Sequence, residues 1–150
     1  DMREHCECTP DQQRRHRNRI SAPFLDRIDL QIEVPRVKQA DLQSLTAGES
    51  SATVRERVAL ARQRQLKRQQ KINNALSGRE VEQLCALADK DQKLLNGAME
   101  RFKLSARAYH RILKVARTIA DLADSADIRT PHLTEALSYR ALDRLAALNQ

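Results

Sequence analysis

Residues 104–122 read LSARAYHRILKVARTIADL, and this stretch decides which fold we expect for the chain. Its apolar residues recur every three or four positions, whereas Arg107, Arg111 and Lys114 fall on the opposite side of a helix with that period. The stretch predicts an amphipathic helix over residues 105–124, at the centre of a helical bundle. Its apolar stripe consists of Ala108, Ile112, Val115, Ala116, Ile119 and Ala123.

Helices are also predicted on both sides of this stretch, because helix start signals recur along the chain. Thr53-Val-Arg-Glu56 and Ser77-Gly-Arg-Glu80 have the spacing of a capping box, in which a hydroxyl and a carboxylate satisfy two backbone N–H groups. Thr130-Pro131 places a proline at the start of a further helix, where its missing N–H would have no partner. The predicted helices span residues 10–19, 53–72, 77–88, 91–102, 105–124 and 131–147.

The composition agrees with a mainly α fold. Glycine occurs three times and aromatic residues make up 3% of the 150 residues, while alanine, leucine, arginine, glutamate, glutamine and lysine are common. The side chains of these common residues lose little freedom in a helix. A chain of this length is long enough for one domain with a buried core.

One stretch, residues 28–34, predicts a strand instead of a helix. Apolar side chains alternate there with polar ones, which places the apolar set on one face of a sheet, and Pro35 ends the pattern. A single strand cannot pair its backbone donors and acceptors by itself. We therefore expect this strand to complete the sheet of a larger α/β protein, with the rest of the sheet upstream. The alternating apolar residues are Ile28, Leu30, Ile32 and Val34.

The formal net charge of +7 is concentrated in two stretches. Residues 55–71 hold seven basic residues and one acidic residue, and residues 101–117 hold six basic residues and no acidic one. Two interpretations stay open: the basic residues form solvated helix faces, or they form surfaces for an anionic partner. For the second interpretation, the candidate DNA-binding residues are Arg62, Arg64 and Lys67.

The chain lacks the motifs of a complete active site. A phosphate-binding loop needs the pattern GxxxxGK[ST], and the glycines at 48, 78 and 97 do not form it. No HExxH or GxSxG motif occurs either. We therefore expect that this chain alone neither binds ATP tightly nor hydrolyses it.

Cysteine content and hydropathy predict a cytoplasmic protein with no membrane partner. Three cysteines, an odd number, do not form a disulfide framework in a chain of this size, which is typical of a reducing compartment. The sequence contains no run of about 18 apolar residues and does not begin with the layout of a signal peptide.

Four segments of the chain resemble the ComM group of magnesium-chelatase-like AAA+ ATPases. They are RNRISAPFLDRIDL at 17–30, GESSA at 48–52, NNALSG at 73–78 and the stretch at 104–122. The resemblance covers nearly the whole chain. It implies that residues 1–36 form the end of an AAA+ core, that residues 37–52 form a linker and that residues 53–150 form the C-terminal helical lid domain.

The resemblance also implies roles for three arginines. Arg27 matches the arginine finger, which acts in trans on ATP bound by a neighbouring subunit, and Arg107 matches the sensor 2 arginine, which with Arg111 contacts the phosphates of ATP in its own subunit. A guanidinium presents five donors in a planar fork, which suits the oxygens of a phosphoryl group in its transition state. The alternatives are a salt bridge of Arg27 with Asp26 or Asp29, and an exposed helix position without a ligand for Arg107.

For the whole protein, the resemblance implies a hexameric ring of identical subunits that hydrolyses ATP with Mg²⁺ and drives DNA branch migration in recombination and natural transformation. The expected partners are ATP, other copies of the chain and DNA. Two alternatives stay open. One is the ATPase subunit of a metal chelatase, and the other is a basic helical module that binds nucleic acid without enzymatic activity.

Metal binding is not expected in this chain. Cys6 and Cys8 resemble the second half of a four-cysteine element of the ComM group, whereas a structural zinc site normally has four ligands. Cys85 lies in an apolar helical context, which predicts a core position. We interpret the remaining candidates as a packing residue and two residues on helix surfaces, namely Tyr109, His110 and His132.

Overall fold

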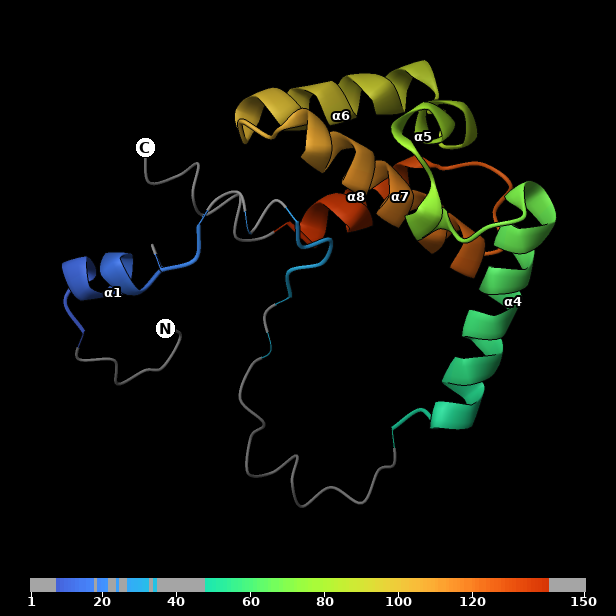
Figure 1. The fold of residues 1–150 in the computed structure, drawn as a ribbon, viewed down its shortest axis with the longest axis horizontal. Coiled ribbons are helices and arrows are strands. Elements are labelled where there is room, and N and C mark those ends of the chain that lie inside the picture. Colours follow the sequence, from blue (N-terminus) through green and yellow to red (C-terminus); the bar gives the residue numbers. More distant parts are fainter. Residues whose placement is uncertain are drawn as a thin grey trace.

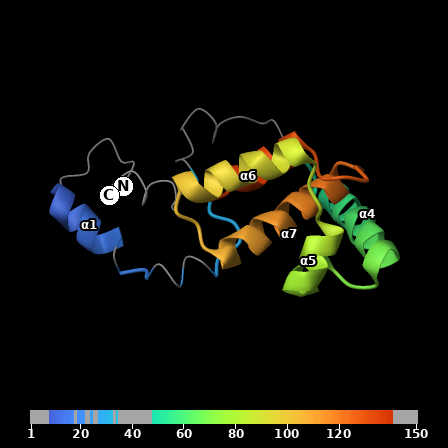
Figure 2. The same ribbon diagram turned by 90° about the horizontal axis from the view of Figure 1, so that it is seen from above.

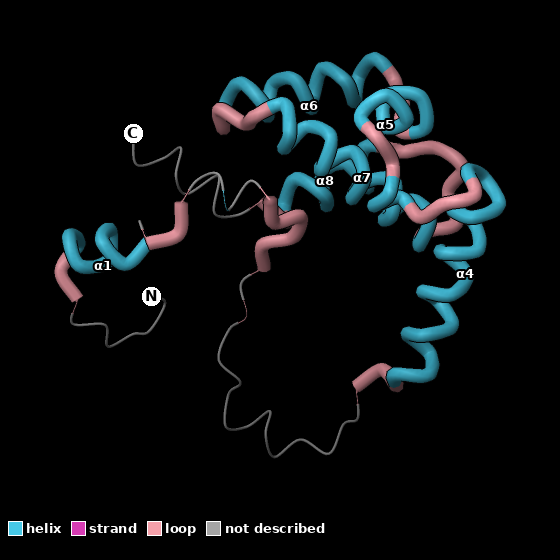
Figure 3. The backbone as a smooth tube through the Cα atoms, in the orientation of Figure 1, coloured by secondary structure: helices cyan, strands magenta, loops and turns pink. Residues whose placement is uncertain are grey.

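The computed structural model describes residues 8–17, 19–21, 24, 27–32, 34 and 48–140. In this part of the chain the structure is mainly helical, which confirms the prediction of a mainly α bundle (Figures 1 and 3). The helices are α1 (Pro10–Arg17), α4 (Ser51–Gln69), the 3-10 helix η1 (Asn73–Ala75), α5 (Gly78–Leu84), α6 (Asp89–Arg101), α7 (Ala106–Leu122) and α8 (Thr130–Ser138).

Helix α7 lies at the centre of the bundle, as the sequence predicts. Helices α4, α5, α8 and η1 all pack against α7, and α6 packs against α8. Figure 1 shows α4 extending out of the bundle, and Figures 1 and 2 both show α1 at a distance from the other helices.

The core forms because α7 turns one apolar stripe inward. Ala108, Ile112 and Ala116 are at most 1% exposed, and their small or medium side chains let the neighbouring helices approach closely. Ala123, also predicted in this stripe, is exposed because α7 ends one residue earlier. Burial of one leucine or isoleucine side chain contributes roughly 1.5–3 kcal/mol. The other helices and loops contribute Leu76, Val81, Leu95, Ile128 and Leu133 to this core.

Two helix starts are capped by serine hydroxyls. Ser105 precedes α7, and its hydroxyl accepts the Ala108 N–H at 3.2 Å. Ser77 and Glu80 form the predicted capping box of α5: the Ser77 hydroxyl accepts the Glu80 N–H at 3.4 Å, and the Glu80 carboxylate accepts the Ser77 N–H at 2.8 Å. Both caps satisfy N–H groups that have no partner within the helix.

Three other helix starts differ from the prediction, and one of them is α6, which begins at Asp89 and not at residue 91. Helix α4 begins earlier than predicted, because Ser50 and not Thr53 is the N-cap and its hydroxyl accepts the Thr53 N–H at 3.2 Å. Helix α8 begins at Thr130, so this residue is helical and does not cap the helix. The cap position belongs to Arg129, whose N–H is accepted by Nδ1 of His132 at 3.1 Å.

All six predicted helices also end earlier than predicted, by one residue in α6 and by two or more in the others. Helix α4 ends at Gln69 and not at residue 72, because Gln70 has a left-handed φ of 59°, which does not continue a helix. Helix α5 ends at Leu84, and α8 ends at Ser138. Of the helix predicted up to residue 147, residues 141–147 lie outside the described part. None of the helices in the described ranges is both long and apolar enough to cross a lipid bilayer.

In place of the predicted strand at residues 28–34, the structure has a single parallel bridge between Gln31 and Arg140. Within the described residues no second strand is available to pair with this segment, so its backbone bonds the end of α8 instead. Gln31 is buried as a result. Three of the four apolar residues expected on a sheet face are exposed, namely Leu30 (53%), Ile32 (69%) and Val34 (79%), whereas Ile28 is half-buried. The linker predicted at 37–52 is described only from residue 48 onward.

Candidate functional site

A cavity of about 220 Å³ lies where α7 faces the start of α5. Four of its lining residues lie on α7, at positions 107, 110, 111 and 114, a spacing that places them on one face of the helix. Residues from η1, from α5 and from the N-terminal segment complete the lining. The lining residues are Asp29, Asn74, Gly78, Arg107, His110, Arg111 and Lys114.

The charges around this cavity are mostly positive. Three side chains that are cationic at neutral pH, Arg107, Arg111 and Lys114, face one carboxylate, that of Asp29. Lys114 donates to the carbonyl of Asn74 at 3.0 Å, which holds its ammonium group at the cavity wall. An excess of positive charge in a partly enclosed space attracts anions.

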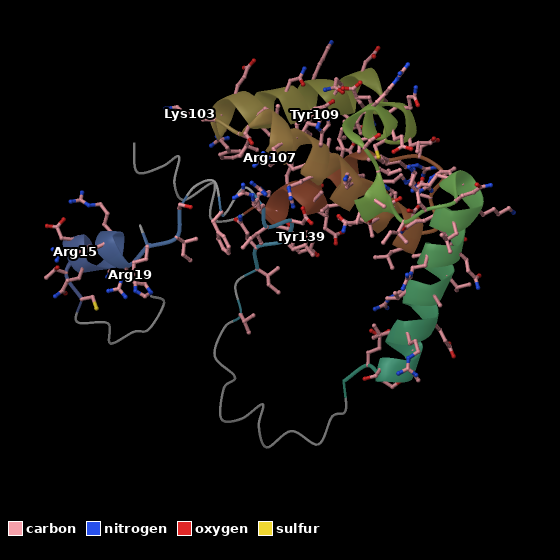
Figure 4. All side chains as sticks on the ribbon, in the orientation of Figure 1. Arg15, Arg19, Lys103, Arg107, Tyr109 and Tyr139 are labelled. Atoms are coloured by element: carbon pink, nitrogen blue, oxygen red, sulfur yellow. The ribbon has the colours of Figure 1, made fainter. Side chains whose placement is uncertain are left out.

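Among these cations, Arg107 is the one that is free to bind a ligand. It is exposed on the first turn of α7 (Figure 4). Within the described residues its guanidinium takes part in no hydrogen bond or ion pair. A guanidinium without a protein partner keeps all five N–H donors for a ligand. This is the residue that the sequence resemblance matches to the sensor 2 arginine.

The start of α5 forms another wall of the cavity. Gly78 lies there, and a Cβ atom at this position would lie 3.3 Å from the His110 ring, so glycine leaves room for the ring. Glu80 follows in the same helix, and hydrogen bonds from Lys71 and Ser77 lower the pKa of its carboxyl from 4.5 to about 2. The ion pair with Lys71 compensates the charge of this carboxylate.

The segment that carries Arg27 contacts the same face of α7. Arg111 donates from Nη1 to the Arg27 carbonyl at 2.7 Å and forms an ion pair with Asp29. Arg27 itself is exposed, and its guanidinium makes no hydrogen bond or ion pair in the described part of the chain. Of the two salt-bridge partners considered for Arg27, Asp29 is thus bound to Arg111, and Asp26 lies outside the described residues.

The end of α8 holds this segment from a second side. Arg140 has a buried side chain and donates from Nη1 to the Ile28 carbonyl at 2.9 Å. The Gln31 N–H donates to the Tyr139 carbonyl at 2.7 Å, and Figure 4 labels Tyr139 beside this segment. The backbone that carries Arg27 is therefore fixed by contacts with both α7 and the end of α8.

The three candidate DNA-binding residues lie on α4 in different surroundings. Arg62 and Lys67 are exposed. Arg64 donates to the carbonyl of Asp121 at 2.7 Å and forms an ion pair with Asp124 at 2.8 Å. Arg62 and Lys67 therefore present their charge to solvent, whereas Arg64 helps to hold α4 against the end of α7.

A buried polar cluster between α4, η1 and α7 is not predicted from the sequence. Asp121 is 1% exposed and accepts hydrogen bonds from Arg68, Asn73 and Arg117. Arg117 is 3% exposed and also donates to two carbonyls of the loop after α7. Both arginines belong to the basic stretches defined above, so part of that charge is internal. The spacing of Arg117 and Asp121, four residues apart in an apolar helix, is the signal that could have indicated this pair.

The Asp121 carboxylate keeps its negative charge although it is buried. Burial alone would raise the pKa of this carboxyl, but the hydrogen bonds from Arg68 and Asn73 and the charge of Arg117 outweigh it, so the pKa lies below its ordinary value of 3.8. Asp121 is therefore ionised at neutral pH and compensates the buried arginine. This cluster fixes the position at which α4 meets α7.

The cysteines do not form a metal site in the described residues. Cys85 is buried in the core, as predicted, and burial raises the pKa of its thiol from 9.0 to about 11. Tyr109 also packs against the core, as predicted. Cys8 is exposed, and Cys6 lies outside the described residues. Across the described ranges, His, Cys, Asp and Glu side chains do not gather in groups of three that could hold a metal ion.

Comparison with known proteins identifies relatives along nearly the whole chain. Residues 48–140 match the family model for magnesium chelatase, subunit ChlI C-terminal, and residues 1–42 match the model for magnesium chelatase, subunit ChlI. The chain is 51% identical to protein YifB of Escherichia coli (strain K12) and 52% identical to competence protein ComM of Haemophilus influenzae, over 142 residues in each case.

These alignments cover 94% of this chain but only 28% of each relative. A protein of Mycobacterium tuberculosis is also 34% identical over 139 residues, which are 90% of this chain and 27% of that protein. The C-terminal family model matches the described bundle from the residues before α4 to the end of α8. The chain therefore belongs to the magnesium chelatase subunit ChlI C-terminal family and is of the ComM type.

Proposed function

We propose that this chain supplies the phosphate-sensing arginine and the arginine finger of a ring-forming ATPase of the AAA+ class. The cationic cavity on α7 is the observation that carries the proposal, because Arg107 offers an unbound guanidinium there. An anion with several oxygens, such as the end of a nucleoside triphosphate, complements this arrangement through charge-assisted hydrogen bonds.

In this proposal, Arg107 contacts the phosphates of ATP bound by its own subunit. Lys114 adds positive charge at the cavity wall, and Arg111 lies one turn further along α7. ATP arrives with Mg²⁺, which is held elsewhere in the full-length protein. The lining residues come from α7, η1 and α5. A bound phosphate therefore interacts with several elements of the lid at the same time.

Arg27 acts on a different ATP molecule, the one bound by the neighbouring subunit. Its guanidinium has no partner within the described residues, whereas its backbone is fixed by Arg111. A fixed backbone with a free guanidinium suits a residue that must reach a transition state on another subunit. Arginine fingers of this kind contribute about 10³–10⁵ in rate.

DNA is the substrate that we propose for the motor. The relative from Haemophilus influenzae is named competence protein ComM, and the resemblance to the ComM group favours a hexamer that drives DNA branch migration in recombination. The exposed Arg62 and Lys67 on α4 give the chain a basic surface for such a partner. A chelatase subunit is the second candidate, because both matching family models are described as magnesium chelatase subunit ChlI.

Single substitutions in the full-length protein test the two arginines. We expect Arg107→Ala to weaken ATP binding about tenfold or more, because it removes a ground-state contact with the phosphates. We expect Arg27→Ala to leave ATP affinity within about twofold and to lower turnover at least about 10³-fold, because its contact forms in the transition state. Calorimetry and a steady-state ATPase assay measure the two effects.

Arg55→Ala is the matched control, because Arg55 is an exposed helix arginine on α4, away from the cavity. It should leave both ATP affinity and turnover unchanged. Normal ATP binding by Arg107→Ala would refute the proposed role of the cavity. ATP turnover that branched DNA stimulates would favour the motor over the chelatase.

A further inference from the structure

The helical bundle holds the segment that carries Arg27 through hydrogen bonds to two successive backbone carbonyls, those of Arg27 and Ile28. Arg111 of α7 donates to the Arg27 carbonyl and pairs with the Asp29 carboxylate. Arg140, after α8, donates to the Ile28 carbonyl. A guanidinium can serve a carbonyl and a carboxylate together because its N–H donors form a rigid fork.

Arg111 takes part in two sites at once. It lines the cavity together with Arg107, which precedes it by one helical turn on α7. It also donates a hydrogen bond to the backbone carbonyl of Arg27, whose guanidinium has no partner in the described residues. A single rigid helix thus connects the cavity with the segment of Arg27.

We propose that Asp29 and Arg111 form a positioning pair that sets where Arg27 lies. The inference rests on the proposed function, in which Arg27 completes the site of a neighbouring subunit. Asp29 holds the Arg111 guanidinium against the Arg27 carbonyl. Because Arg111 and Arg107 lie on the same helix, a movement of α7 at the cavity also moves the backbone of Arg27. Each subunit's own phosphate site is thereby coupled to the finger that it offers to its neighbour.

The solvent exposure of Asp29 and Arg111 allows a role in positioning Arg27 to be distinguished from a role in stabilising the fold. The Asp29 side chain is 44% exposed and the Arg111 side chain is 27% exposed. Ion pairs with this much solvent contact contribute little to the free energy of unfolding. A large effect of Asp29 on ATP turnover would therefore come from the position of Arg27 and not from loss of the fold.

The test uses the full-length protein with Asp29→Asn, which removes the charge and keeps the shape. We expect turnover to fall about 10- to 100-fold, because a displacement of about 1 Å in a catalytic group can cost about 10²-fold. ATP affinity should not fall, since Arg107 is untouched and the substitution removes the negative charge from the lining of the cavity. The melting temperature should not change.

Glu49→Gln is the matched control. It breaks an ion pair with Arg57, and the Glu49 side chain is 44% exposed, the same as that of Asp29. This variant should keep wild-type turnover. Arg111→Lys keeps a cation opposite Asp29 and should retain more activity than Arg111→Ala, because the lysine still pairs with the carboxylate.

A double mutant identifies the residue through which Asp29 acts. Adding Asp29→Asn to Arg27→Ala should cause no further loss of the residual turnover, since the finger is already absent. An equal loss in both backgrounds would overturn the inference, because Asp29 would then act elsewhere. Wild-type turnover in Asp29→Asn, with Arg27→Ala inactive, would also overturn it and leave the proposed function standing. Normal turnover in Arg27→Ala would refute both.

Discussion

At the residue scale, Asp121 is a buried side chain that joins three elements of the bundle. Its carboxylate is the acceptor for three donors from α4, η1 and α7. A buried charge of this kind is tolerated only while its partners remain in place. Removing one partner leaves the other buried charges uncompensated.

We predict that Asp121→Asn lowers the free energy of unfolding by about 3–5 kcal/mol, because Arg117 would stay buried without its counter-charge. Urea unfolding of the 150-residue chain, followed by circular dichroism, measures this change. Asp124→Asn is the matched control, since the ion pair of Asp124 with Arg64 is exposed and should contribute less than about 1 kcal/mol. A loss below about 1 kcal/mol in Asp121→Asn would show that the cluster does not stabilise the fold.

The same carboxylate predicts a loss of stability in acid. The pKa of Asp121 in the folded state lies below its ordinary value of 3.8, so folding favours the charged form. The resulting stability is present above about pH 4 and is lost as the pH falls through the folded-state pKa. Between about pH 5 and pH 2, the wild type should therefore lose more stability than Asp121→Asn. Urea titrations of both proteins in the same stabilising osmolyte measure the free energy of unfolding at each pH. Equal losses of stability in the two proteins would show that Asp121 is not the source of the acid sensitivity.

Single residues were predictable where one helix face decides their environment. Arg107 and Lys114 follow from the period of α7, because the apolar stripe fixes which side is turned away from the core. Arg117 belongs to the basic stretch at 101–117, but its side chain is buried and does not add to a basic surface. Its burial depends on Asp121 and on the loop after α7, which only the tertiary structure brings together.

At the element scale, predictions succeeded where local signals agreed with one another. The start of α5 was predicted because hydroxyl, carboxylate and helix period all point to the same residue, Ser77. The start of α4 was misplaced because Ser50 and Thr53 are both good caps, and sequence spacing alone favoured the later one. In its described residues, the segment at 28–34 forms a bridge and no strand, since a strand forms only where a partner strand pairs with it.

Helix α4 carries a prediction about DNA binding by the full-length protein. Arg62→Gln combined with Lys67→Gln should reduce the slope of log affinity against log salt by about two, because each lost phosphate contact removes about 0.9. Filter binding to duplex DNA over a range of salt concentrations measures the slope. An unchanged slope would remove α4 from the DNA interface.

Arg64→Gln is the control for this experiment. The Arg64 guanidinium is bound to Asp121 and Asp124, so it has little charge to offer to a phosphate. The slope should therefore change by less than in the double variant, and the main effect should be a weaker attachment of α4 to α7.

At the scale of the whole molecule, the cavity combines residues that lie far apart in the sequence. Asp29, Asn74 and Gly78 meet four residues of α7. The family resemblance indicated Arg27 and Arg107 separately, but no sequence pattern placed Asp29 beside Arg111. That contact depends on how the N-terminal segment lies across the bundle, which is set by bonds to Tyr139 and Arg140.

The central claim is that Arg27 and Arg107 of one chain serve two different ATP molecules. Mixing two inactive full-length variants tests it directly. One variant carries Arg27→Ala with an intact phosphate-binding loop, and the other has an inactivated phosphate-binding loop but keeps Arg27. Some interfaces in a mixed ring then unite one intact half from each variant.

We predict that this mixture recovers part of the ATPase activity, because the missing finger is supplied in trans. The same partner mixed with Arg107→Ala should not recover, because both defects lie on the same side of every interface. Recovery is measured as steady-state turnover in rings whose mixed composition is verified by mass spectrometry. An Arg27→Ala mixture that stays inactive in verified mixed rings would contradict the account.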